Sequence, residues 1–126
     1  MKKIHHVGYV AEDIETFKNS FVQMNLVSKI LDVIQDAKIE LLTVGDGSFV
    51  ELIQPLSPKA FTWNFMRKNK QGLHHICYEG YSLEEVEELI TKTKMMKIRG
   101  PIPAILFNRD VIFAMTRSRD IIEFII

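Results

Sequence analysis

The sequence predicts an α+β fold built from two βαβββ modules. A histidine-containing phrase occurs twice, as "IHHVGY" at residues 4–9 and as "LHHICY" at residues 73–78. Each phrase is followed by a segment with the apolar spacing of a helix, and then by three segments with the character of strands. Because self-similarity over such a period indicates duplicated supersecondary units, we expect the two halves to fold alike.

The first element of each half is a strand and the second is an amphipathic helix. The histidine pairs lie in apolar runs that are typical of strands. Apolar residues recur at i, i+3 and i+7 in both helices: they are Ile14, Phe17 and Phe21 in the first half, and Leu83, Val86 and Ile90 in the second. Ser82 and Glu85 have the spacing of a capping box, which predicts the start of the second helix.

Three further strands complete each half. We expect them at 27–34, 38–44 and 48–54 in the first half, and at 96–102, 109–116 and 120–126 in the second. The last strands of the two halves match, because "FVELI" (49–53) and "IIEFI" (121–125) each carry one glutamate among apolar residues.

The length of 126 residues suits a single domain. We expect it to consist of a first module (1–56), a linker helix (57–71) and a second module (72–126). Ser57 as N-cap and Pro58 at the first helical position predict where the linker helix begins.

The composition argues against several classes of protein. Sixteen basic residues balance sixteen acidic ones, so no net charge attracts nucleic acid or a membrane surface. No apolar run approaches the ~20 residues that span a bilayer, and the N-terminal segment has no signal-peptide pattern. The single cysteine, Cys77, excludes an internal disulfide framework. We therefore expect a cytoplasmic protein that binds neither nucleic acid nor membrane.

Strand periodicity distinguishes the two histidines of each pair. Side chains two residues apart share a face of a strand, so His6 shares a face with Gly8, and the equivalent neighbour of His75 is a cysteine. A small neighbour leaves room for a ligand, and we predict that His6 and His75 are the functional pair. His5 and His74 share faces with bulky residues and are expected to face the helices.

Glu51 and Glu123 occupy matching places in the two last strands. A carboxylate among apolar residues is costly to bury unless it meets a cation or a metal. Together with His6 and His75 the two glutamates form a set with one histidine and one glutamate per module. Such an N2O2 set suits one divalent metal ion, Zn, Ni, Co, Mn or Fe(II), with room for two waters.

These motifs resemble the vicinal-oxygen-chelate superfamily, which includes glyoxalase I, bleomycin resistance proteins and methylmalonyl-CoA epimerase. The resemblance is carried by the βαβββ repeat and by "HHVGYVAEDIETF", "FVELIQPLSP" and "GLHHICYEG", and residues 50–79 are especially similar to the epimerase branch. It implies two modules whose strands form a curled mixed sheet around a shared metal cleft, often in a homodimer. The family's ligand positions match His6, Glu51, His75 and Glu123.

The resemblance also implies an enzyme, a lyase or isomerase that acts on a small carbonyl or thioester substrate. In such a site the metal is a Lewis acid that stabilises an enolate or enediolate, and a carboxylate moves the proton alpha to the carbonyl. The ligand glutamate of the last strand often serves as the base in this family, which favours Glu123. Lactoylglutathione-lyase-like and methylmalonyl-CoA-epimerase-like reactions both fit.

Two segments depart from the epimerase pattern. Epimerases carry a second, non-ligand glutamate near the start of the third strand, where this chain has Gln35 followed by Asp36. As the second catalytic position, Gln35 cannot accept a proton, and Asp36 should point the other way in a regular strand. The stretch "GPIPAILFNRDVIF" (100–113) resembles a lactoylglutathione-lyase-like branch. Its Asn108 and Arg109 are candidate binders of a carboxylate, a phosphate or a CoA-type arm.

Two alternatives stay open. A non-catalytic small-molecule binding or resistance protein on the same fold would hold no metal, and the four intact ligand positions argue against it. An extradiol dioxygenase or a thiol transferase would typically use three protein ligands, and Glu51 adds a fourth. The sequence names neither the substrate nor the metal.

Overall fold

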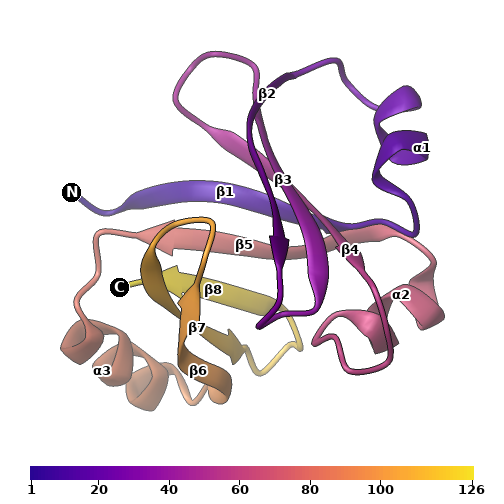
Figure 1. Cartoon of the computed structure of the whole chain (residues 1–126). Coiled ribbons are helices and arrows are strands. Elements are labelled where there is room, and N and C mark those ends of the chain that lie inside the picture. The colour runs from indigo at the N-terminus through magenta and orange to yellow at the C-terminus, as the bar shows by residue number, and fades with distance from the viewer.

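All eight strands of the computed structural model, which describes residues 1–126, form one mixed sheet (Figure 1). Its order is β2-β3-β4-β1-β5-β8-β7-β6. β1 pairs with β4, and β5 with β8, in parallel, whereas all other neighbours are antiparallel. The antiparallel pair β1–β5 is therefore the seam at which the two modules join.

The order of elements along the chain is βαβββ in each module, as predicted. The first module contains β1 (Lys3–Val10), α1 (Ile14–Asn19), β2 (Asn25–Asp32), β3 (Ala37–Thr43) and β4 (Phe49–Pro55). The second contains β5 (Gly72–Glu79), α3 (Leu83–Thr93), β6 (Met96–Ala104), β7 (Arg109–Met115) and β8 (Ile121–Ile125). The predicted α+β class and curled mixed sheet are thus confirmed.

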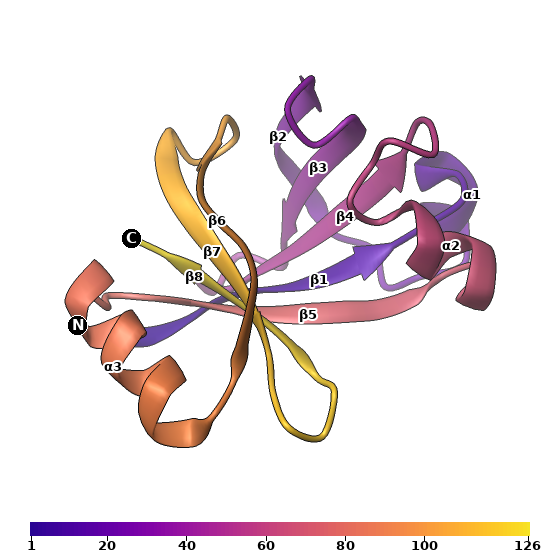
Figure 2. The same ribbon diagram turned by 90° about the horizontal axis from the view of Figure 1, so that it is seen from below.

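The curl of the sheet is clearest along the direction of Figure 2. The central strands β1 and β5 cross the middle of the molecule, and the hairpins β2–β3 and β6–β7, at the two ends of the sheet, both rise above them. α1 and α3 each pack against the module to which they belong, because each buries an apolar stripe against its own strands. Neither helix covers the opposite face of the sheet, which lies inside the curl and carries the other set of strand side chains.

Strand alternation divides the core between these two faces. In β4, Leu52 packs with α1, whereas the next residue, Ile53, packs with Val10 and Ile39. In β8, Phe124 packs with α3 and Ile125 does not. Period-2 alternation therefore places the residues before and after Leu52 and Phe124 inside the curl.

The linker helix is shorter than the sequence predicted. α2 (Trp63–Asn69) begins after Thr62, and residues 57–62 form turns. The Ser57 hydroxyl accepts a hydrogen bond from the Lys59 N–H and donates one to the Asp36 carboxylate. Ser57 therefore stabilises a turn that is tied to the β2–β3 connection, and the prediction that it caps the helix was wrong.

The helix termini of the second module follow the prediction more closely. Ser82 and Glu85 form both hydrogen bonds of the capping box, at 3.1 and 3.0 Å. α3 is the longest helix, with 11 residues, and none of the helices combines the length and the apolar character that crossing a membrane requires.

Two substitutions on α3 test how its apolar stripe is used. Ile90 is 8% exposed and Leu83 is 46% exposed, although the sequence places both on one stripe. We expect Ile90→Ala to lower the free energy of unfolding by about 2–5 kcal/mol, because it leaves a cavity against β7 and β8. Leu83→Ala, the matched control, should cost less than about 1 kcal/mol. Urea unfolding followed by circular dichroism measures both, and equal losses would contradict the packing described.

Candidate metal centre

Four predicted side chains from the two modules meet inside the curl. One ligand atom from each of His6, Glu51, His75 and Glu123 lies within 4.8 Å of the other three. All four residues are buried, with exposed fractions of 1%, 4%, 2% and 2%. The structure thus brings together the complete set that the sequence predicted.

The register of the four central strands explains this convergence. Glu51, Gly8 and His75 are neighbours across β4, β1 and β5, and form one row. His6, Cys77 and Glu123 form a second row across β1, β5 and β8. In each row a histidine and a glutamate flank a small residue, so their side chains can converge above it.

The missing side chain of Gly8 is required by this arrangement. A Cβ at this position would overlap the imidazole of His75, lying 2.5 Å from Nε2 and 2.7 Å from Nδ1. His75 therefore occupies the volume that a side chain at position 8 would fill. The sequence signal, a small residue two positions after the histidine, has a direct steric cause here.

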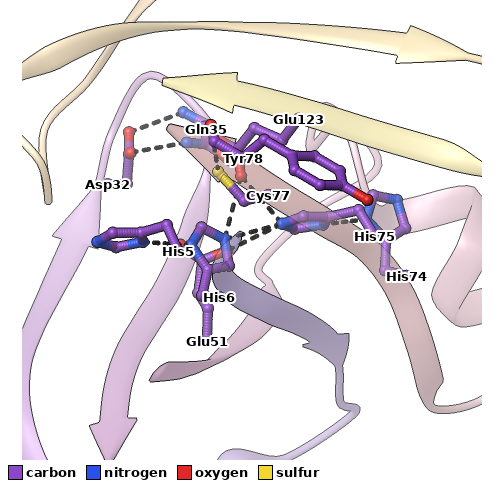
Figure 3. Close-up of polar contacts among 10 residues, drawn as sticks. All are labelled: His5, His6, Asp32, Gln35, Glu51, His74, His75, Cys77, Tyr78 and Glu123. Carbon is purple, nitrogen blue, oxygen red and sulfur yellow. Dashed lines mark hydrogen bonds and ion pairs between the residues drawn. The ribbon is translucent and has the colours of Figure 1, made fainter. Parts of the chain in front are cut away.

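The four side chains of the cluster approach one another closely (Figure 3). Neutral imidazoles and ionised carboxylates in this arrangement have too few N–H donors for all of these contacts to be hydrogen bonds. Nε2 of His6 lies 3.1 Å from Nε2 of His75, and Oε1 of Glu123 lies 3.1 and 3.0 Å from these two atoms. Oε1 of Glu51 lies 3.4 and 3.5 Å from the same nitrogens. Glu123 Oε1 is buried and forms no well-aligned hydrogen bond. Its two imidazole neighbours can satisfy it only when they are protonated, so neutral imidazoles leave a costly buried acceptor.

A divalent metal ion fits this cluster. Separations of 3.0–3.5 Å between the donor atoms are those expected around one ion with metal–ligand bonds of ~2.0–2.2 Å. Two carboxylates and two neutral imidazoles also carry a charge of −2, which such an ion neutralises. An ion would satisfy Glu123 Oε1 and remove the repulsion between the two imidazole lone pairs.

The pKa values show how strongly the groups interact without an ion. Burial raises the pKa of Glu51, but the adjacent His6 and His75 lower it to about 2. Glu123 follows the same pattern, and its pKa is also held below its usual range. Conversely, burial lowers the pKa of His6 and His75, but the carboxylates raise both above 6.5. In the absence of metal, protonated His6 and His75 therefore supply the positive charge that balances the two carboxylates.

The other two histidines are not arranged as simple strand alternation predicts. The β1–β5 pairing contains two irregularities, which make His5 an extra residue in β1 and His74 an extra residue in β5. Such β-bulges re-aim side chains. His5 packs against Phe49 and not against a helix, so its predicted orientation was wrong, whereas His74 does contact Phe65 of α2 at 5.0 Å.

Gln35 and Asp36 lie in the turn between β2 and β3. Gln35 is buried, and its amide donates a hydrogen bond to Asp32 at 3.2 Å. Asp32 also accepts the backbone N–H groups of Ile34 and Gln35 and so stabilises the turn. Asp36 adopts a positive φ of 53° and its carboxylate binds the Ser57 hydroxyl. Asp36 is thus engaged elsewhere, and the catalytic role of Gln35 stays a prediction.

Asn108 and Arg109 lie at the β6–β7 turn. Asn108 has a positive φ of 53°, a conformation that asparagine tolerates in turns. Arg109 is exposed, and its guanidinium contacts the Glu79 carboxylate and the Ile126 carbonyl oxygen, both at 3.4 Å. Neither residue belongs to the four-residue cluster, and their substrate-binding role stays a prediction.

Phe107 and Phe113, whose rings contact the ligand histidines, were not identified from the sequence. The Phe107 ring stacks on His6 with 5.4 Å between centroids, and Phe113 meets His75 edge-on at 5.6 Å. Phe107 lies in the β6–β7 turn, where its apolar character was the only available signal. A cavity of about 670 Å³ also borders His75, between α2 and the β7–β8 turn, and Lys68 and Arg119 contribute to its wall.

Two βαβββ modules that share one buried centre of histidines and carboxylates define a protein of the vicinal-oxygen-chelate type. Residues 5–113 match the family model of the glyoxalase/bleomycin resistance protein/dioxygenase superfamily, and the chain belongs to this superfamily. No sequence match to a curated protein was found.

Several solved structures share the fold over nearly the whole chain. Hypothetical protein BH1468 from Bacillus halodurans C-125 is 25% identical, with a TM-score of 0.84 and coverage of 98% of this chain and 93% of its own. Methylmalonyl-CoA epimerase from Mycobacterium tuberculosis is 18% identical, with a TM-score of 0.82 and coverage of 97% and 85%. A Streptomyces coelicolor methylmalonyl-CoA epimerase variant with 2-nitronate-propionyl-CoA is 16% identical, with a TM-score of 0.79 and coverage of 98% and 95%.

Gly8→Ala tests the steric basis of the centre. We expect the new methyl group to displace the His75 ring and to weaken divalent-metal binding at least 100-fold, more than loss of a supporting residue around a metal site usually costs. Cys77→Ala is the matched control, because position 77 already accommodates a small side chain in the second row. Isothermal titration with Co²⁺ measures both variants. Metal binding by Gly8→Ala at wild-type affinity would show that His75 is not a ligand.

The pH dependence of the metal-free protein tests the charge pairing. His6 and His75 have folded pKa values raised above 6.5, so their contribution to stability is present below pH 6.5 and is lost as the pH rises through those values. Glu51 and Glu123 act in the opposite direction, and their contribution, present above pH 4.5, is lost as the pH falls.

His74 also lowers the stability of the metal-free protein at acidic pH. Burial and the adjacent His75 lower its pKa to about 3, so folding becomes less favourable as the pH falls below 6.5. We therefore expect the metal-free protein to have its highest Tm near pH ~6. Saturating Zn²⁺ should abolish the fall in Tm above this pH, because the ion replaces the protons of His6 and His75 as the positive charge beside the glutamates. An alkaline decline that is unchanged by Zn²⁺ would contradict the pairing.

Proposed function

We propose that the chain is a metal-dependent enzyme, a lyase or isomerase that moves a proton on the carbon alpha to a carbonyl or thioester. The observation that supports this most directly is the buried cluster of two histidines and two glutamates, in which one carboxylate oxygen forms no well-aligned hydrogen bond. Purely structural clusters of this kind are expected to satisfy their buried polar atoms. Perturbed carboxyl and imidazole groups at one buried place are typical of functional sites.

His6, Glu51, His75 and Glu123 would hold the ion, Zn, Ni, Co, Mn or Fe(II). A bound divalent ion supplies a Lewis acid that polarises the substrate carbonyl and makes the adjacent C–H more acidic. If the ion were six-coordinate, four protein ligands would leave two coordination positions for oxygen atoms of the substrate or of water. Burial of the cluster excludes water, which strengthens every charge interaction of the reacting group.

Glu123 is our proposed base. Its carboxylate takes the proton from the alpha carbon and returns it to the same or to the neighbouring carbon. The choice of Glu123 over Glu51 rests on the resemblance to the superfamily, in which the ligand glutamate of the last strand often serves as the base. Gln35 is the proposed second catalytic residue, but its amide can only orient the substrate by hydrogen bonding and cannot accept a proton. This difference favours a one-carboxylate reaction of the lactoylglutathione-lyase type over a two-base epimerisation.

A thioester or hemithioacetal is the proposed substrate class. Two of the similar structures are methylmalonyl-CoA epimerases, one of them bound to 2-nitronate-propionyl-CoA. The wall of the cavity beside His75 contains Lys68, Arg119 and one carboxylate, Asp120. Neither basic residue forms an ion pair with a carboxylate, so the cavity offers room and two free positive charges for an anionic arm of the substrate. Asn108 and Arg109, at the β6–β7 turn, remain candidate substrate-binding residues.

Two further predictions belong to this proposal. We propose a homodimer, for which the exposed apolar residues Leu26, Val27 and Leu31 on edge strand β2 provide a surface. A cytoplasmic location likewise stays a prediction.

A non-catalytic binding or resistance protein is the alternative. The superfamily to which the chain belongs includes bleomycin resistance proteins. This alternative requires no metal, so it predicts a purified protein that neither contains nor binds divalent ions. The geometry of the four donors favours the enzyme.

Metal analysis and solvent exchange test the proposal together. We expect about one divalent ion per chain in the wild type and at least 100-fold weaker binding in Glu51→Ala and Glu123→Ala. Glu40→Ala is the control, because Glu40 is a buried carboxylate on β3 that pairs with Lys18 outside the cluster. The metal-loaded wild type should exchange the alpha proton of a thioester with D2O or convert a thiol–methylglyoxal adduct.

The outcomes separate the hypotheses. Unchanged metal content in both glutamate variants would contradict the four-ligand site. A metal-loaded protein that neither exchanges the alpha proton of methylmalonyl-CoA nor converts the methylglyoxal adduct would contradict these substrates. Tight binding of a small molecule without metal would support the alternative.

A further inference from the structure

The first histidine of each pair contacts the second in the same way in both modules. Nδ1 of His5 lies 2.8 Å from Nδ1 of His6, and Nδ1 of His74 lies 2.8 Å from Nδ1 of His75 (Figure 3). Both distances are those of a hydrogen bond between ring nitrogens. Because the two contacts were formed by separate stretches of chain, their equality indicates one shared requirement.

A β-bulge makes each contact possible. In a regular strand, adjacent side chains point to opposite faces and cannot meet. The extra residue of the first bulge is His5, and that of the second is His74. The bulges thus occur at the two positions that must turn toward a ligand histidine, as bulges near active sites do.

The contact and a metal ion on Nε2 would together determine which nitrogen of each ring carries a proton. Nε2 of His6 and Nε2 of His75 face the cluster, so metal binding requires these atoms to be unprotonated. A neutral imidazole then carries its proton on Nδ1. Nδ1–H of His6 must donate to Nδ1 of His5, which must itself be protonated on Nε2, and the same holds for His75 and His74.

Aromatic rings hold the two accepting histidines in place. His5 lies between Phe49 and Phe107, with centroid distances of 5.0 and 5.1 Å. His74 lies against Phe65 at 5.0 Å and Phe61 at 5.8 Å. These neighbours restrict ring rotation and offer no competing donor or acceptor.

We propose that His5 and His74 are positioning residues that accept the Nδ1–H of His6 and His75 and so hold each Nε2 bare and directed at the metal. This inference rests on the proposed metal centre. The partner of a metal-bound histidine is usually a carboxylate or a carbonyl group, and this chain uses a second histidine in both modules. His74 is 7% exposed whereas His5 is half-buried, so water can replace His5 more readily than His74.

Paired substitutions at each position test the proposal. His74→Leu fills the space but removes the acceptor, whereas the amide oxygen of His74→Asn lies where Nδ1 was and can accept. We expect Co²⁺ to bind 10–100-fold more weakly to His74→Leu, and His74→Asn to recover most of the loss. The corresponding His5 variants should show the same order with a smaller loss. The Co²⁺ absorption spectrum reports ligand geometry, and urea unfolding reports stability.

Imidazole ¹⁵N shifts of the metal-loaded wild type give a readout that needs no variant. The proposal predicts protonation at Nδ1 in His6 and His75, and at Nε2 in His5 and His74. Wild-type Co²⁺ affinity in both Leu variants, equal weakening by Leu and Asn in proportion to stability, or the opposite tautomers would overturn the positioning role. Absence of Co²⁺ binding by the wild type would overturn the metal centre itself.

Discussion

The structure depends on placing two carboxylates and two imidazoles within ligand distance of one another where water cannot reach them. Such a group is unfavourable to bury unless its charges are balanced. With neutral imidazoles the cluster has a charge of −2, and the buried Glu123 Oε1 has no hydrogen-bond donor. A divalent ion balances the charge and satisfies the oxygen at once. Bringing the four side chains this close requires room for the His75 ring, and the absent side chain of Gly8 provides it.

The β1–β5 seam gives the cluster its symmetry and divides it between the modules. Each row across the seam contains a glutamate from one module and a histidine from the other: Glu51 with His75, and Glu123 with His6. Neither module contains a complete site. An ion bound to all four residues would therefore link the modules in addition to the strand pairing, and its binding would be coupled to correct association of the halves.

The fold and the convergence of the four residues could be predicted from the sequence because they follow from periodicity and repetition. The period of two selected His6 and His75, and a lone carboxylate at the matching place in each last apolar strand selected Glu51 and Glu123. The bulges at His5 and His74 could not be predicted, because they depend on the β1–β5 register, which no local pattern specifies. The linker helix was misplaced for a similar reason: Ser57 has the character of an N-cap, but its hydroxyl binds Asp36, which is distant in sequence.

The approximate symmetry of the ligands does not extend to their surroundings. Phe107 stacks on His6, whereas Phe113 meets His75 edge-on, and the cavity borders only the His75 side. Gln35 has its hydrogen-bonding partner in Asp32 of the first module, and the corresponding turn of the second module carries Phe107 instead. Under the proposed function, two chemically equivalent glutamates could therefore have different roles, because their surroundings differ. Under that function, substrate choice would then depend on the two hairpin turns rather than on the four proposed ligands.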